Sequence, residues 1–115
     1  MTDITQIEKV PPQNNEAEMS LLGSILIDKD AMLKIADIVD ADDFYKNAHN
    51  AVFETMSELY NKNEPVDVLT LGNRLEEKNQ LEKIGGRSYL ISLSNAVPTA
   101  SHVEQYAKIV RRKST

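Results

Sequence analysis

Few side chains in this sequence have the types and spacing that catalysis or metal binding requires. The two histidines, His49 and His102, lie far apart, no H-E-x-x-H pattern is present, and there is no cysteine to complete a metal site. Asp40, Asp42 and Asp43 are close together, but their stretch lacks the glycine turn and the distal glutamate of an EF-hand. We therefore interpret these acids as caps of a turn and expect no metal-binding residues.

Phosphate binding and nucleophilic catalysis also lack a candidate. A phosphate-binding loop needs a glycine followed by lysine, and none of the four glycines, Gly85-Gly86 included, is followed by lysine. The G-x-S-x-G pattern that exposes a nucleophilic serine is missing as well. The sequence therefore predicts no catalytic and no cofactor-binding residues. It favours His49 as a surface residue or a hydrogen-bonded core residue.

The composition is typical of one soluble globular domain. The chain has 115 residues, 41% of them hydrophobic and 27% charged, with a net charge of −5. No apolar run approaches the roughly 20 residues that cross a bilayer, and the first residues do not form a signal peptide. We therefore expect a cytoplasmic protein with no membrane partner. The acidic body would repel nucleic-acid phosphates, so any direct DNA contact would have to use the cations at 108–113. These cations are more simply explained by the preference of basic residues for a helix C-terminus.

Hydrophobic spacing predicts an all-α fold, a compact bundle of about six helices. The expected helices cover about 15–27, 30–39, 47–62, 68–78, 86–95 and the chain from 101 onward. The third should be the central helix, because its apolar stripe holds the largest side chains, namely Val52, Phe53, Met56, Leu59 and Tyr60. The second should bury Met32, Ile35, Ala36 and Val39.

Capping patterns predict where several helices begin. Asn15 with Glu18, and Ser101 with Glu104, have the types and spacing of capping boxes. Asp67 is a favoured N-cap for the fourth helix. The acids at 40–43 should cap a turn that carries the side chains of residues 44 and 45, Phe44 and Tyr45, into the core.

Two glycine positions predict backbone features. Gly85-Gly86 favours left-handed or extended backbone before the fifth helix. Gly23 lies inside the first helix, where glycine costs about 1 kcal/mol relative to alanine. The sequence suggests that a close helix crossing at Gly23 compensates for this cost, and a flexible site at this position is an equal alternative.

The last helix is unfinished at Thr115. Its apolar stripe continues to the end with neither glycine nor proline to stop it, and comprises Val103, Tyr106, Ala107, Ile109 and Val110. We therefore expect the chain to be a fragment of a longer protein that acts by docking or assembly.

Four stretches, read in order, resemble the N-terminal domain of the bacterial replicative DNA helicase, the DnaB family. They are PPQNNEAEMSLLGSILID (11–28), DDFYKNAHNAVFETMSELY (42–60), PVDVLTL (65–71) and GGRSYLISLSNAVPTASHVEQYAKIV (85–110). Asn47 is a departure, since relatives often carry proline there, which suits a first helical position.

The resemblance implies a flexible lead-in at 1–14, a globular helical head at 15–100 and the start of a C-terminal helical hairpin at 101–115. In the family this domain forms a collar on a hexameric ring, as a trimer of dimers, and docks primase; a helicase loader is another expected partner. ATP and Mg²⁺, and 5′→3′ unwinding of DNA, belong to an ATPase motor domain that is absent from this chain. The fragment itself is therefore expected not to be an enzyme.

Two sets of residues are candidates for interaction. Tyr106, Ile109 and Val110 have no head to cover on the last helix, so we expect them to mediate self-association. A second set of acids should face a basic partner such as primase, and comprises Glu54, Glu58, Glu76 and Glu77.

Other assignments stay open at this point. The helicase-docking domain of primase is thought to resemble this fold, although Glu16-Ala17-Glu18 and Gly85-Gly86 favour the helicase. A stand-alone helical adaptor is a further alternative. A small enzyme would need clustered polar groups in a pocket, and a helix-turn-helix DNA binder would need a basic recognition helix.

Overall fold

The computed structural model of this chain describes the backbone of residues 12–114 and the side chains of residues 15–111. Within that range the fold is all-α, as the sequence predicts, and no strand is present. The elements in chain order are α1 Pro12–Ile27, α2 Ala31–Ile35, a 3₁₀-helix η1 Ala41–Asp43, α3 Asn47–Asn61, α4 Val68–Glu77, α5 Leu81–Ile84, α6 Gly86–Ser94 and α7 Val103–Ser114.

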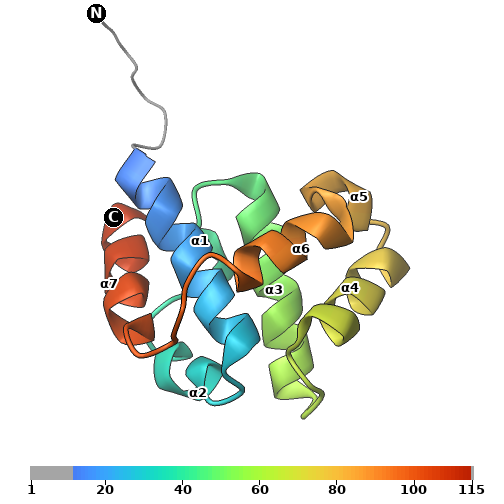
Figure 1. The fold of residues 1–115 in the computed structure, drawn as a ribbon, viewed down its shortest axis with the longest axis horizontal. Helices are drawn as coiled ribbons and strands as arrows, with labels where there is room; N and C mark the ends of the chain where they lie inside the picture. The colour runs from blue at the N-terminus through green and yellow to red at the C-terminus, as the bar shows by residue number, and fades with distance from the viewer. Residues whose placement is uncertain (1–11, 115) are drawn as a thin grey trace, which may run out of the picture.

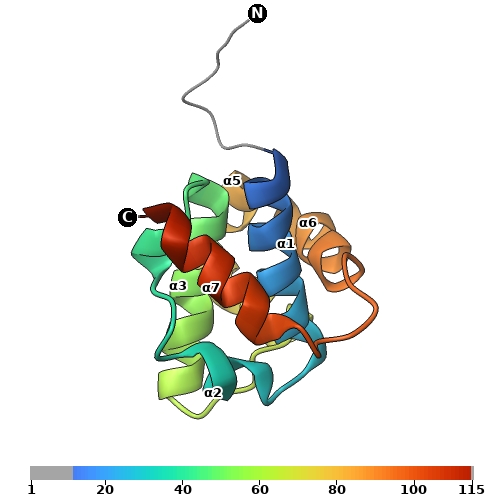
Figure 2. The same cartoon turned by 90° about the vertical axis from the view of Figure 1, so that its left-hand side faces the viewer.

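The helix α1 lies at the middle of the bundle. It packs against α7 on one side and α6 on the other, with α3 behind it (Figure 1). The side view shows α7 running across the face of α1, with α2 closing one end (Figure 2). The helices α4 and α5 pack against α3 and α6. The expectation that α3 alone is central is therefore wrong, because α1 shares that position.

The core forms where the apolar stripes of α1 and α3 meet their neighbours. Four of the five predicted α3 stripe residues are buried, and Tyr60 packs half-buried against the same core. Phe44 and Phe53 lie with their ring centroids 5.0 Å apart, so the only two phenylalanines of the chain pack on each other. The buried residues of α1 in this core are Ala17, Leu21, Leu22 and Ile25.

Several predicted boundaries are confirmed. Asp67 caps α4, since its carboxylate accepts the Thr70 backbone N–H at 2.8 Å. Gly85 has a φ of +115°, which is left-handed backbone between α5 and α6. The Asp43 carboxylate accepts the Asp40 backbone N–H at 2.8 Å, so these acids cap η1 as expected.

The first helix starts earlier than its predicted cap. α1 begins at Pro12, so Asn15 lies inside the helix, where its amide contacts the Met19 sulfur, and Glu18 does not cap the helix. The helix therefore begins three residues before its predicted start at about 15, and residues 1–11 of the predicted lead-in at 1–14 lie outside the described residues. Proline suits a first helical position because it has no N–H to satisfy there.

Two other segments depart from their predicted form. The helix α2 is short, and Ala36 is exposed just after it, whereas Met32, Ile35 and Val39 are buried as expected. Phe44 enters the core, but Tyr45 is 53% exposed. An alternation of inward and outward side chains in the extended segment after η1 explains why only one of these two neighbours is buried.

The last helix covers α1. α7 begins at Val103, two positions after the predicted cap at Ser101, and its residues Val103, Ala107 and Val110 are buried in the common core. The expectation that Val110 has no part of the head to cover is therefore wrong. Tyr106 is half-buried against the core and Ile109 is 37% exposed.

The predicted close crossing at Gly23 is confirmed. A Cβ built on Gly23 would lie 2.1 Å from the Leu93 carbonyl oxygen, so α1 and α6 touch backbone to backbone. No real Cβ contact is that short, because the two atoms would overlap. Glycine at this position therefore sets the separation of α1 and α6.

We predict that Gly23→Ala lowers the free energy of unfolding by about 1–3 kcal/mol, because the new methyl group forces α1 away from α6. Gly72→Ala is the matched control: its Cβ would meet the flexible end of the Arg87 side chain, which can move aside. Gly72→Ala should be neutral or gain up to about 1 kcal/mol from helix propensity. Denaturant titration of both variants tests this, and equal effects would contradict it.

Candidate interaction surfaces and the buried polar network

A buried carboxylate joins three segments of the chain. Glu18 of α1 is 1% exposed and its Oε1 lies 2.7 Å from Nδ1 of His49 in α3, which is fully buried. The other carboxylate oxygen, Oε2, accepts the Tyr45 backbone N–H at 2.7 Å. Both oxygens therefore have partners, as a buried carboxylate requires.

Tyr89 of α6 completes this network. Its hydroxyl lies 2.5 Å from His49 Nε2, and the two rings stack with centroids 5.9 Å apart. With the imidazole proton on Nδ1, His49 donates to Glu18 and accepts the Tyr89 O–H. Burial, and secondly the negative charge of Glu18, raise the pKa of Tyr89 above its ordinary value.

The network holds helices together and has no means of attacking a substrate. His49 is sealed from solvent, and both of its ring nitrogens are engaged. A general base must reach the proton of a bound substrate, which this imidazole cannot. Among the described residues, no group of three or more His, Cys, Asp or Glu side chains could hold a metal ion. Of the two predictions for His49, a surface residue or a hydrogen-bonded core residue, the second is confirmed.

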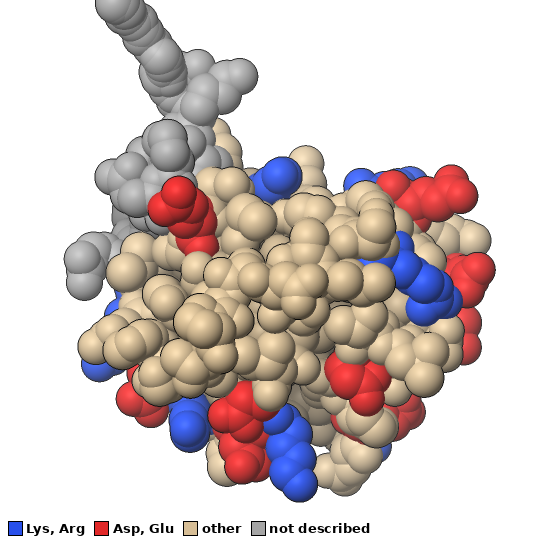
Figure 3. Space-filling model, in the orientation of Figure 1, with Lys and Arg blue, Asp and Glu red and all other residues tan. Residues whose placement is uncertain are grey.

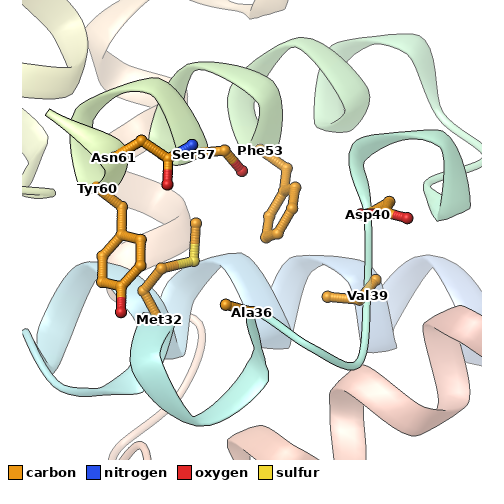
Figure 4. A pocket seen from close by; sticks show the side chains of 8 residues that line it. All are labelled: Met32, Ala36, Val39, Asp40, Phe53, Ser57, Tyr60 and Asn61. Atoms are coloured by element: carbon orange, nitrogen blue, oxygen red, sulfur yellow. The ribbon is translucent and has the colours of Figure 1, made fainter.

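A groove lies between α2 and α3. It has a volume of about 220 Å³, and Figure 4 shows α3 side chains facing Ala36 and Val39 across it. Its apolar wall can accept a large aliphatic side chain, and its polar rim can offer hydrogen bonds. The lining residues are Met32, Ala36, Val39, Asp40, Phe53, Ser57, Tyr60 and Asn61.

The four predicted partner-facing acids do not form one uniform acidic face. Glu58 pairs with Lys78 at 2.9 Å, and Glu77 pairs with Arg74 at 3.2 Å. Glu76 lies toward α6, where its carboxylate is 3.2 Å from Arg87. Ion pairs of this exposed kind stabilise the fold little, but they neutralise the charge that a basic partner would meet.

Glu54 differs from these three acids. It is exposed on α3 and has no ion pair with any other residue whose side chain the structure describes. The partner-facing role of all four acids stays a prediction. Glu54 is the one whose negative charge is not neutralised by a neighbouring cation among the described side chains. The self-association role of Tyr106, Ile109 and Val110 also stays a prediction.

Comparison with known proteins places this helical bundle in a family. The family described as DnaB-like helicase N terminal domain matches residues 10–112. The chain belongs to this DnaB-like family. A crystal structure of the N-terminal domain of DnaB helicase from Mycobacterium tuberculosis superposes with a TM-score of 0.86 at 39% identity, covering 91% of this chain and 73% of that one.

Curated relatives of this DnaB-like domain are much longer proteins. The replicative DNA helicase DnaB of Geobacillus stearothermophilus is 45% identical over 107 residues, which are 93% of this chain and 24% of that protein. The replicative DNA helicase DnaC of Bacillus subtilis is 41% identical, over 99% of this chain and 25% of that protein. The chain thus spans about a quarter of each of these relatives.

Sequence reasoning assigned Glu18 to a cap and so missed its buried role in this DnaB-like domain. A signal for it existed, because Glu18 precedes Leu21, Leu22 and Ile25 by three, four and seven positions. This spacing puts the carboxylate on the apolar face of α1. An acid on such a face needs a buried partner, and His49 is one of only two histidines that could supply it.

We predict that Glu18→Gln lowers the free energy of unfolding by about 1–3 kcal/mol, because an amide offers one acceptor where the network needs two. Glu16→Gln, two residues earlier and exposed, is the control and should change stability little. Thermal and denaturant unfolding measure both. If the two variants proved equally stable, the buried carboxylate would have no special role.

The raised pKa of Tyr89 makes the free energy of unfolding depend on pH in the alkaline range. Its folded pKa is raised, so the unfolded chain loses the hydroxyl proton first, near pH 10. The stabilisation is complete below about pH 10 and is lost as the pH rises from there through the folded pKa. Tyr89→Phe should therefore flatten the alkaline fall in stability, whereas Tyr60→Phe should keep it. Alkaline slopes that match in all three proteins would contradict this assignment.

Proposed function

We propose that this chain is the assembly and docking domain of a replicative DNA helicase, supporting a hexameric ring and receiving primase. The observation that carries the proposal is the family match over residues 10–112 of a chain that spans about a quarter of helicase relatives. The buried histidine network fixes α1, α3 and α6 relative to one another, so the domain presents a rigid surface to any neighbour. The relatives are named helicases, which favours this assignment over the docking domain of a primase.

Only the solvent-facing side of α7 is available for self-association. Val110 contributes to the core of its own chain, so its side chain is not available to a second copy. Ile109 is the exposed member of the predicted set, and half-buried Tyr106 lies one turn before it. We propose Ile109 as the residue of α7 that contacts another copy, with Tyr106 beside it.

Primase docking is proposed to use acids that are not already neutralised. Glu54 has no ion pair with another described side chain, whereas Glu58, Glu76 and Glu77 each have a cation nearby. Complementary charge mainly raises the rate of association, so docking through Glu54 should weaken as salt rises. A helicase loader is a further proposed partner.

The longer parent protein is proposed to supply the enzyme activity. Its motor domain would bind ATP and Mg²⁺ and move 5′→3′ along DNA, in the cytoplasm. This chain would contact DNA only through that parent. Among the described residues, no helix is both long and apolar enough to cross a membrane.

A chimera tests the proposal. Residues 10–112 would replace the matching segment of the Geobacillus stearothermophilus helicase, whose 45% identity should keep the junctions compatible. Native mass spectrometry should find a hexamer, and the ring should bind primase from the source of this chain. Ile109→Ser should weaken the ring, and Glu54→Lys should slow primase binding at low salt only.

Each arm of the chimera experiment can contradict one half of the proposal. A chimera that stays monomeric would remove the assembly role. A hexamer that binds no primase, with the parental helicase binding its own primase as control, would remove the docking role.

A further inference from the structure

The groove between α2 and α3, here called the α2–α3 groove, has a buried apolar floor. Met32, Val39 and Phe53 line it, and each of them is only 2% or 3% exposed. Figure 4 shows Asp40 at one end of the groove and Tyr60 at the other, with the apolar side chains between them. The volume of about 220 Å³ leaves room for one large aliphatic side chain from another molecule.

The two walls of the α2–α3 groove are acidic. Residues 35–45, which provide most of the α2 wall, contain four aspartates and no lysine or arginine. The other wall is α3, which contains two glutamates and likewise neither lysine nor arginine. By contrast, Figure 3 shows a broad area without charged side chains across the middle of the side where α1 and α6 face the viewer. The excess of negative charge along the groove walls favours a basic partner.

Two of the aspartates carry charge that no neighbouring cation neutralises. Asp37 and Asp40 are exposed, and neither has an ion pair with a residue whose side chain the structure describes. Asp40 also lines the groove, so its carboxylate lies where the cation of a bound segment can approach it. Glu58 of α3, in comparison, is paired with Lys78 at 2.9 Å. A bound cation is therefore attracted most strongly at the Asp40 end of the groove.

We propose that the α2–α3 groove is a docking site for a segment of another protein that carries a large aliphatic side chain beside lysine or arginine. The aliphatic side chain enters the groove and contacts Val39 and Phe53, and the cation lies near Asp40. The site goes beyond the proposed function, because none of its lining residues belongs to the sets proposed for self-association or primase docking.

The charge of the groove disfavours two other occupants. Nucleic acid would bring phosphates against the acidic walls, which repel them. A second copy of this chain in a two-fold contact would set the same acidic walls against each other, and the net charge of −5 adds to that repulsion. A basic segment gains from the same charges, and an aliphatic side chain within it gains from leaving water.

The groove is preformed and has further apolar surface beside it. Phe53 packs on Phe44 with the ring centroids 5.0 Å apart, so the floor is held in place from behind. Leu33 of α2, three positions before Ala36, is 68% exposed and offers additional apolar area to a docked segment. A rigid floor loses little conformational entropy when a segment binds.

Nitrogen-15 NMR of the 115-residue chain with three synthetic peptides of about ten residues tests the proposal. The first peptide has two leucines flanked by lysines, the second has glutamates in place of the lysines, and the third has serines in place of the leucines. The first should shift the backbone amide signals of Phe53 and Ser57 and bind with a dissociation constant of about 1 mM or lower. The other two should bind at least about tenfold more weakly, since each lacks one half of the recognition.

A pair of alanine variants tests whether the peptide enters the groove. Ala36→Phe fills the groove without changing its charge, and should raise the dissociation constant of the first peptide at least about tenfold. Ala96→Phe is the matched control, because Ala96 is likewise exposed but lies between α6 and α7 and does not line the groove. It should leave the constant unchanged. The amide spectrum of each variant also establishes that it is folded.

A pair of charge variants tests the role of the aspartates and does not depend on filling the groove. Asp37→Asn combined with Asp40→Asn should raise the dissociation constant about threefold or more at low salt, and less at high salt. Asn at position 40 still serves as an N-cap. Glu16→Gln combined with Glu82→Gln removes two negative charges from exposed positions that do not line the groove, and should have little effect.

Several outcomes would overturn the proposal. They are amide shifts outside the groove only, equal binding of the lysine and glutamate peptides, and equal effects of the groove variants and their controls. Groove signals that shift with protein concentration in the absence of peptide would mean that a second copy occupies the groove, which also overturns it. In the helicase chimera, Ala36→Phe should leave ring formation and primase binding intact, and loss of either would contradict a separate site. Failure of the peptides to bind would not alter the chimera results, so the proposed function stands or fails separately.

Discussion

The contact between the Glu18 carboxylate and the His49 ring constrains the rest of this fold. A carboxylate that is 1% exposed is stable only if both oxygens are hydrogen-bonded, which here requires His49 and the Tyr45 backbone N–H at 2.7 Å each. His49 in turn needs a partner for its second nitrogen, and Tyr89 provides it. These requirements fix α1, the segment before α3, α3 itself and α6 relative to one another, with a specificity that apolar packing alone does not give.

The same constraint shapes the outer surface. Because Tyr89 of α6 hydrogen-bonds to His49 of α3, and α6 touches α1 at Gly23, the stretches of α1 and α6 without Asp, Glu, Lys or Arg (19–27 and 88–94) lie side by side. The charged residues of α3 and α4 lie elsewhere and are largely paired, with Arg74 close to Glu58, Glu64 and Glu77. The molecule therefore presents an uncharged surface and a charge-balanced surface in different places. This division suits a domain that contacts more than one kind of neighbour.

Features encoded by neighbouring residues could be predicted from the sequence, and features that depend on distant contacts could not. The Asp67 cap, the left-handed Gly85, the α3 stripe and the crossing at Gly23 were all predicted and are present. Glu18 satisfies both a capping pattern and an apolar-face pattern, and only the position of His49, 31 residues away in sequence, decides between them. Likewise, the stripe of α7 predicts burial but does not say which surface covers Val110. The candidate interaction residues remain predictions, because exposure alone does not identify a partner.

The arrangement of the helices depends most on the buried hydrogen bond from His49 to Glu18, and nitrogen-15 NMR of the two histidine rings tests this bond directly. His102 is exposed and serves as an internal reference in the same spectrum. We expect the Nδ1 proton of His49 to be observable and to exchange with water far more slowly than any ring proton of His102. A His49 ring proton that exchanged as fast as those of His102 would contradict a sealed network and the arrangement of helices built on it.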